Sequence, residues 1–134
     1  MFITYPQPNG QVAVVIPCGD VNNAIKDVPE GSEYKIVESV DIDNDYFNAY
    51  EFDAELGAKV NIEKAKAIHL DKFRSARSPK LQKLDIDFIK AVEANDEVKK
   101  AEIVAAKQAL RDVTLTPLPD DLAGIKATWP EVLK

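Results

Sequence analysis

The fold of this protein is decided by residues 61–113, which read NIEKAKAIHLDKFRSARSPKLQKLDIDFIKAVEANDEVKKAEIVAAKQALRDV. The stretch contains no glycine and a single proline, so almost nothing in it opposes a helix. Its apolar residues recur three or four positions apart, which places them on one side of a helix while charged residues occupy the other side. The first apolar series consists of Ile62, Ala65, His69, Phe73, Ala76, Leu81, Leu84, Phe88 and Ala91.

The periodicity is interrupted at Asn95 and Asp96, which are both good helix-capping residues. Glu97 follows them, and an acidic residue favours the N-terminus of a new helix. We therefore predict two helices that form an antiparallel hairpin with its turn at Asn95 and Asp96. The second helix would carry two apolar faces, which is more than one hairpin partner can cover. The bulky face holds Ile103, Leu110 and Val113, and the small-residue face holds Ala101, Ala105 and Ala109.

Pro79 leaves two structures open for the first helix. A proline inside a helix removes one hydrogen bond and clashes with the preceding turn, at a cost of about 3 kcal/mol. In one structure the helix is continuous but kinked, because the carbonyl of Ser75 loses its hydrogen bond. In the other, Ser78 caps a new helix with Pro79 in its first position. The apolar phase is nearly kept across the proline, which favours the continuous helix.

Residues 2–53 have the composition of short β-strands. Asn9 and Gly10 tolerate positive φ and lie between two runs rich in β-branched and aromatic residues, which predicts a β-hairpin. Asp20 is placed to cap two short helical turns over residues 21–27. The strands predicted in this part are 2–5, 11–16 and 34–37.

A fourth strand is predicted over residues 46–53, where aromatic side chains fall on both faces. Residues 54–60, which include Gly57, are predicted to be a connector. The fold class is therefore α+β, a small N-terminal antiparallel sheet followed by a long antiparallel helical hairpin. The predicted domains are a small antiparallel β head over 1–57 and a helical hairpin with an extended Trp-Pro tail over 58–134.

The chain changes character after residue 113. Prolines make residues 114–119 extended, and Asp120-Asp121 can start a short helix that runs through Ile125. Trp129 is expected to anchor the tail rather than to serve as a platform for a cofactor.

The net charge of −6 is unevenly distributed. Residues 1–60 hold three basic and eleven acidic residues, whereas residues 61–134 hold fourteen basic and twelve acidic ones. An acidic head repels phosphates, so we expect no binding to nucleic acid. No run of apolar residues approaches the length of a membrane span, so no membrane association is expected. Cys18 is the only cysteine, which excludes an internal disulfide.

The acidic run Asp41–Asp45 resembles the opening of an EF-hand calcium loop. That loop requires glycine at its sixth position and a bidentate glutamate at its twelfth. These positions hold Tyr46 and Phe52 in this chain. We therefore predict an acidic loop between strands and no calcium site.

No other residues form a catalytic or metal-binding constellation. His69 is the only histidine and has no cysteine or second histidine near it, so it is expected to pack on its helix. Cys18 has no basic residue nearby that would lower its pKa and make it a nucleophile. We expect no enzymatic activity, no metal and no cofactor, which leaves binding to another protein.

Several segments resemble small tail-assembly proteins of bacteriophages. In those proteins an Arg-containing helix is followed by a helix with the string Lys/Arg-Gln-Ala-Leu-Arg-Asp, a Pro-containing linker and a closing Trp-Pro. The string is present here as Lys107–Asp112, although residues 79–100 are inserted before it and lengthen the hairpin. The matching segments are 73–77, 81–94, 105–113 and 129–131 in the helical half, and 12–17, 27–31, 34–37 and 48–53 in the head.

This resemblance implies a tail assembly chaperone-like protein, which binds a phage tail or tail-fibre component in the cytoplasm of the bacterial host during virion assembly. The alternative is a virion structural protein that remains on the mature tail or fibre as an adaptor or decoration. Self-association into a homo-oligomer stays open in both cases. The expected partner-binding residues are Arg74, Arg77, Gln108, Leu110, Arg111 and Trp129.

Overall fold

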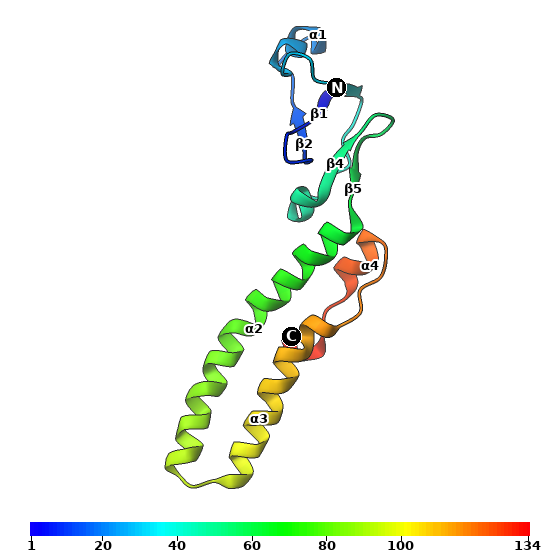
Figure 1. The fold of residues 1–134 in the computed structure, drawn as a ribbon. Helices are drawn as coiled ribbons and strands as arrows, with labels where there is room; N and C mark the ends of the chain where they lie inside the picture. Colours follow the sequence, from blue (N-terminus) through cyan, green and yellow to red (C-terminus); the bar gives the residue numbers. More distant parts are fainter. The chain divides into compact units, whose positions relative to one another are not determined.

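A computed structural model describes residues 1–134 as two compact units, Met1–Ala65 and Lys66–Lys134 (Figure 1). The first unit holds small antiparallel sheets, and the second holds two helices followed by a folded tail. The predicted α+β class is confirmed, because an antiparallel sheet precedes a long helix and a further helix. The division between the units lies further along the chain than the predicted boundary after residue 57.

The predicted β-hairpin is present in the first unit. It consists of strands β1 (Phe2–Pro6) and β2 (Val12–Val15), and β3 (Lys35–Val37) pairs with the other edge of β1 in an antiparallel sheet of order β2-β1-β3. Gly10 has a φ of 85°, and the backbone amide of Gln11 donates to Asn9 Oδ1 at 3.0 Å. The Asn-Gly pair thus supplies the turn as its backbone freedom suggests.

One face of this sheet packs against the predicted helical turns. These are α1 (Val21–Ala24) and the 3₁₀ turn η1 (Ile25–Asp27), with Asp20 Oδ1 accepting from the amide of Asn22 at 2.9 Å. Side chains alternate between the two faces of β1, and Ile3 lies on the face that contacts α1 and η1. It is fully buried there and packs with the buried Ala24 and Val28.

The fourth strand begins later than predicted, because residues 44–49 form the 3₁₀ segment η2 (Asn44–Ala49). The Asp43 side chain caps this segment by accepting from the amide of Asp45, and the Asp43 amide donates to the Tyr50 hydroxyl at 3.2 Å. These local hydrogen bonds compete with strand formation, as short acidic side chains often do. Only β4 (Tyr50–Asp53) remains extended.

The prediction that residues 54–60 form a connector is wrong for the second half of that segment. Strand β5 (Gly57–Val60) lies there and pairs antiparallel with β4 in a separate two-stranded sheet. Gly57 has a φ of 86°, which a glycine adopts without strain as the chain reverses. At the other end of the ladder, Lys64 and the Asn61 side chain both bond to the Glu51 carboxylate. These hydrogen bonds hold the pKa of Glu51 below its usual value.

The helical hairpin is confirmed. Helix α2 (Ile62–Glu93) continues through Pro79, so the continuous alternative is the one the chain adopts, and α3 (Glu97–Arg111) runs back beside it (Figure 1). Asn95 turns the chain with a φ of 53°, and Asp96 Oδ1 accepts from the amide of Lys99 at 3.0 Å. No helix, including α2, combines the length and the apolar character that crossing a membrane requires.

The tail covers part of the apolar surface that the hairpin alone would leave open. After α3 it forms the 3₁₀ turn η3 (Asp112–Leu115), α4 (Leu122–Ala127) and the 3₁₀ turn η4 (Glu131–Leu133). Asp121 caps α4 through the amide of Gly124. The buried core of this unit is made by Phe73, Leu110, Val113 and Leu133.

His69 joins the tail to α2. The ring is 2% exposed, and its Nε2 donates to the carbonyl oxygen of Thr128 at 2.7 Å, since a carbonyl can only accept. Its ring also meets Phe73 edge-on, and Trp129 packs edge-on against Phe73 with 5.3 Å between ring centroids. The histidine is therefore packed as expected, and Trp129 holds the tail against the helix.

Candidate partner-binding face of the helical hairpin

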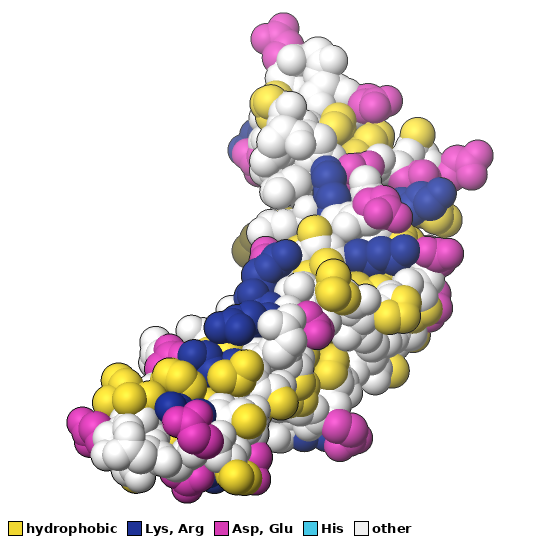
Figure 2. Space-filling view, turned by 60° about the horizontal axis from the view of Figure 1, so that its bottom comes forward, with side chains coloured by type: hydrophobic (Ala, Val, Ile, Leu, Met, Phe, Trp, Pro, Cys, Tyr) yellow, Lys and Arg dark blue, Asp and Glu magenta, His cyan; other side chains and the backbone are white.

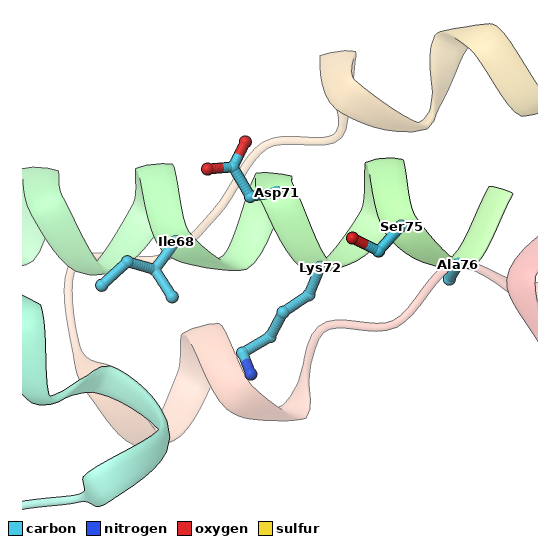
Figure 3. A pocket seen from close by; sticks show the side chains of 5 residues that line it. All are labelled: Ile68, Asp71, Lys72, Ser75 and Ala76. Atoms are coloured by element: carbon cyan, nitrogen blue, oxygen red, sulfur yellow. The ribbon is translucent and has the colours of Figure 1, made fainter. Parts of the chain in front are cut away.

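Shallow depressions lie on the surface of the helical hairpin. One of about 550 Å³ lies along α2 (Figure 3). Asp71 and Lys72 point to different sides of the helix there, and Asp71 pairs with Arg74 at 2.5 Å. General acid–base work requires groups that converge on one position. The depression is lined by Ile68, Asp71, Lys72, Ser75 and Ala76.

The acidic run that resembled a calcium loop has a structural role. Asp43 caps η2, and no group of three or more histidine, cysteine, aspartate or glutamate side chains is arranged to hold a metal ion anywhere in the chain.

The half of the hairpin near its turn exposes large apolar side chains. Figure 2 brings this end of the hairpin forward, and apolar atoms are visible on it among acidic and basic ones. Single exposed apolar residues are ordinary, but several on one short segment mark an interaction surface. The exposed residues are Ile86, Ile89 and Val92 on α2 and Val98 and Val104 on α3.

Three of these residues lie on the same side of the hairpin as the ion pair that Asp85 of α2 forms with Lys107 of α3. Ile89 lies one turn after Asp85, and Val104 lies one turn before Lys107, so both flank the pair. Val92 follows Ile89 by three residues on the same helix. We call Ile89, Val92 and Val104 the distal patch; their exposed fractions are 58%, 45% and 53%.

Cationic side chains continue this side of the hairpin toward the tail. Arg111 lies one turn after Lys107 on α3, and its guanidinium makes no hydrogen bond or ion pair in the structure. Lys107 itself lies over the Phe88 ring at 5.7 Å from the centroid. Figure 2 shows lysine and arginine side chains next to the apolar atoms of the hairpin. We refer to the distal patch with Lys107 and Arg111 as the hairpin face.

The two arginines that the sequence singled out on α2 are already engaged. Arg74 pairs with Asp71, and Arg77 Nη1 donates to the carbonyl oxygen of Arg111 at 2.9 Å. Arg77 therefore satisfies a carbonyl at the end of α3 and ties the two helices together. Arg74 is exposed.

The remaining predicted residues divide between surface and core. Gln108 is exposed and donates to Asp112 Oδ1 at 2.8 Å. Leu110 is 2% exposed and belongs to the core between helix and tail, and Trp129 packs on that core. Leu110 and Trp129 thus support the hairpin from within, and the structure does not bring them together with Arg111 on one open surface.

The residues of the distal patch were not predicted from the sequence. Ile89 and Val92 fall outside the apolar series that predicted the helix, and Val104 lies beside the bulky face of α3. The sequence did contain a signal for this patch, namely apolar residues outside the single stripe of each helix. A helix that packs on one partner needs only one apolar stripe, so the additional residues indicate a second contact. The small-residue face was noted, and Ala101, Ala105 and Ala109 are exposed.

Comparison with protein-family models, with curated proteins and with solved structures found no match to this chain. Its function is therefore inferred from the residues and their arrangement.

Proposed function

We propose that this chain is a non-enzymatic protein-binding module whose hairpin face docks on another protein. The observation that carries the proposal is the distal patch, three large apolar side chains that the hairpin leaves about half exposed on one side. Burying such side chains stabilises a complex by about 25 cal/mol for each Å² of apolar surface removed from water. Arg111 next to the patch favours a partner that carries carboxylates, whereas Lys107 is already paired with Asp85.

The sequence resemblance directs the choice of partner. Following it, we propose that the partner is a bacteriophage tail or tail-fibre component, bound during virion assembly in the manner of a tail assembly chaperone. Retention on the mature tail or fibre as an adaptor or decoration is the second form of the same interaction. Mass spectrometry of purified particles separates the two, because a chaperone leaves and an adaptor stays.

The distal patch can be tested by cross-linking in cells that produce virions. A photoreactive amino acid at Ile89 should capture a tail or tail-fibre protein, and one at Leu115, which is 77% exposed but outside the patch, should not. Ile89→Asp should abolish co-purification of the captured protein, because a charge buried at an interface is costly. Equal capture from both positions, or unchanged co-purification with Ile89→Asp, would contradict the proposal.

Arg111 provides a second, chemically different test. Two carboxylates of the chain, Asp112 and Glu131, have other partners than Arg111: Asp112 accepts from Gln108, and Glu131 pairs with Lys134. The free guanidinium is thus available to form a forked pair with a partner carboxylate, which lysine cannot reproduce.

We expect Arg111→Ala to weaken partner binding by about 1–3 kcal/mol. Arg111→Lys should restore only part of this loss, and both variants should keep the helical circular dichroism of the wild type. Titration calorimetry with the captured partner measures the effect. Binding equal to wild type for both variants would remove Arg111 from the interface, and a loss of helix would show an internal role instead.

A further inference from the structure

The outer edge of β5 is an unpaired strand edge. β5 belongs to a two-stranded sheet and pairs only with β4. The amide of Asn61 donates to the carbonyl of Ala49, so the hydrogen-bonded pairs of this antiparallel ladder are the odd-numbered ones, such as 51 with 59. Bonded and non-bonded pairs alternate in such a ladder. The N–H and C=O groups of Ala58 and Val60 therefore point away from β4.

A cavity of about 430 Å³ runs along this edge. Three consecutive residues of β5, 58–60, line it, which places the cavity at the strand's edge because successive side chains alternate between faces. The opposite wall comes from Val37 at the end of β3 and from the segment 39–41 after it. Its volume lies in the usual range of ligand sites, about 300–1,000 Å³.

A buried polar group also lines this cavity without a partner. The Thr4 side chain is 0% exposed, and its Oγ1 has no hydrogen-bond partner. Most buried polar atoms are bonded, so an unsatisfied one points to an incomplete site. A strand edge beside a cavity and an orphaned hydroxyl in its wall are independent observations on the same place.

We propose that the outer edge of β5 receives an extended, basic segment of a partner protein as an added β-strand. Main-chain hydrogen bonds from Ala58 and Val60 hold the segment in register, which is the mode of strand addition at an open sheet edge. The proposal concerns the head and does not rest on the function proposed for the hairpin face.

The acidic residues of the head favour a basic partner segment at this strand edge. Residues 1–60 carry eleven acidic and three basic residues. The cavity lining itself holds one residue of each sign, Asp41 and Lys59, and the local excess of negative charge comes from Asp53 and Glu55 at the turn that leads into β5. A second copy of this head would bring the same excess of negative charge to the edge, so self-pairing is disfavoured. Leu56 and Val60 add apolar surface to the cavity, which suits a segment that alternates basic and apolar residues.

The test uses the full chain and a labelled peptide of alternating lysine and valine. Ala58→Pro removes the outward N–H and keeps the ladder to β4, because proline is tolerated where a strand N–H faces away from its neighbour. Ala58→Val keeps the N–H and is the matched control. We expect Ala58→Pro to weaken binding at least about tenfold, roughly the loss of one hydrogen bond, and Ala58→Val to bind like wild type.

Two further readouts distinguish strand addition from attraction of charges. Hydrogen exchange at the amides of Ala58 and Val60 should slow when the peptide binds, while Lys59, already bonded to β4, should change little. A peptide of alternating glutamate and valine, and a lysine–valine peptide with methylated backbone nitrogens, should not bind. Absence of binding by the lysine–valine peptide, equal binding of either control peptide, or equal binding to Ala58→Pro would overturn the proposal.

Discussion

Phe73→Ala should lower the free energy of unfolding of the helical unit by about 3–5 kcal/mol, the usual cost of removing a large aromatic side chain from a core. Phe73 is fully buried and lies at the centre of the contacts between α2, the end of α3 and the tail. Its ring meets both His69 and Trp129 edge-on, so the substitution removes two aromatic contacts as well as buried area.

Urea unfolding followed by helical circular dichroism measures this loss. Phe88→Ala is the matched control, because it removes the same side chain from the same helix at a half-buried position under Lys107. We expect it to cost clearly less, since destabilisation scales with the burial that is lost. Equal losses from the two variants would show that the Phe73 cluster is not the core of this unit.

Gly57→Ala should destabilise the head for two additive reasons. With a φ of 86°, residue 57 is in the left-handed region, where a Cβ costs about 1–2 kcal/mol. That Cβ would also lie 2.9 Å from Val37 Cγ1 and 3.1 Å from Thr4 Oγ1. Overpacking of this kind typically adds about 1–3 kcal/mol.

Gly10→Ala separates the two causes. Gly10 has nearly the same φ, 85°, but a Cβ there would meet no atom within 4 Å. It should therefore show the backbone cost alone. The free energies come from hydrogen exchange of the slowest amides of Met1–Ala65, which reports the opening of that unit by itself. If the two variants lose the same stability, the close approach of β5 to β1 and β3 does not exist in solution.

The helical half was predictable because helix periodicity is a strong signal over a long stretch. The apolar series through Phe73 and Leu84, and the capping pair Asn95-Asp96, place α2, α3 and their turn correctly. Pro79 does not end the helix. The sequence indicated this, because the helical spacing of apolar residues is nearly maintained from Phe73 to Leu81. Packing of a continuous apolar side outweighs one lost backbone hydrogen bond.

The head was less predictable because its elements are short and are decided by contacts distant in sequence. Alternating aromatics predicted one strand over 46–53, whereas the cap from Asp43 turns its first half into η2. β5 has little apolar signal of its own, and Gly57 suggested a connector. A strand of this kind exists through its pairing with β4, which no local pattern encodes.

The candidate binding residues also divide into those that could be chosen from the sequence and those that required the structure. Arg111 was singled out from the sequence because of its string, and its role in binding stays a prediction; its guanidinium makes no hydrogen bond or ion pair in the structure. Leu110 was named with it, but one residue along a helix turns by about a quarter of a circle or more, from surface to core. The distal patch required knowing which side of each helix faces the other.

The packing of Trp129 on Phe73 gives the two units separate optical signatures. Trp129 is the only tryptophan and lies in the unit Lys66–Lys134, whereas all four tyrosines lie in the unit Met1–Ala65. Indole fluorescence, excited where tyrosine does not absorb, therefore reports on whether the tail stays attached to α2, and tyrosine fluorescence reports on the head. The order in which the two units melt can be read in one sample, without introducing any label.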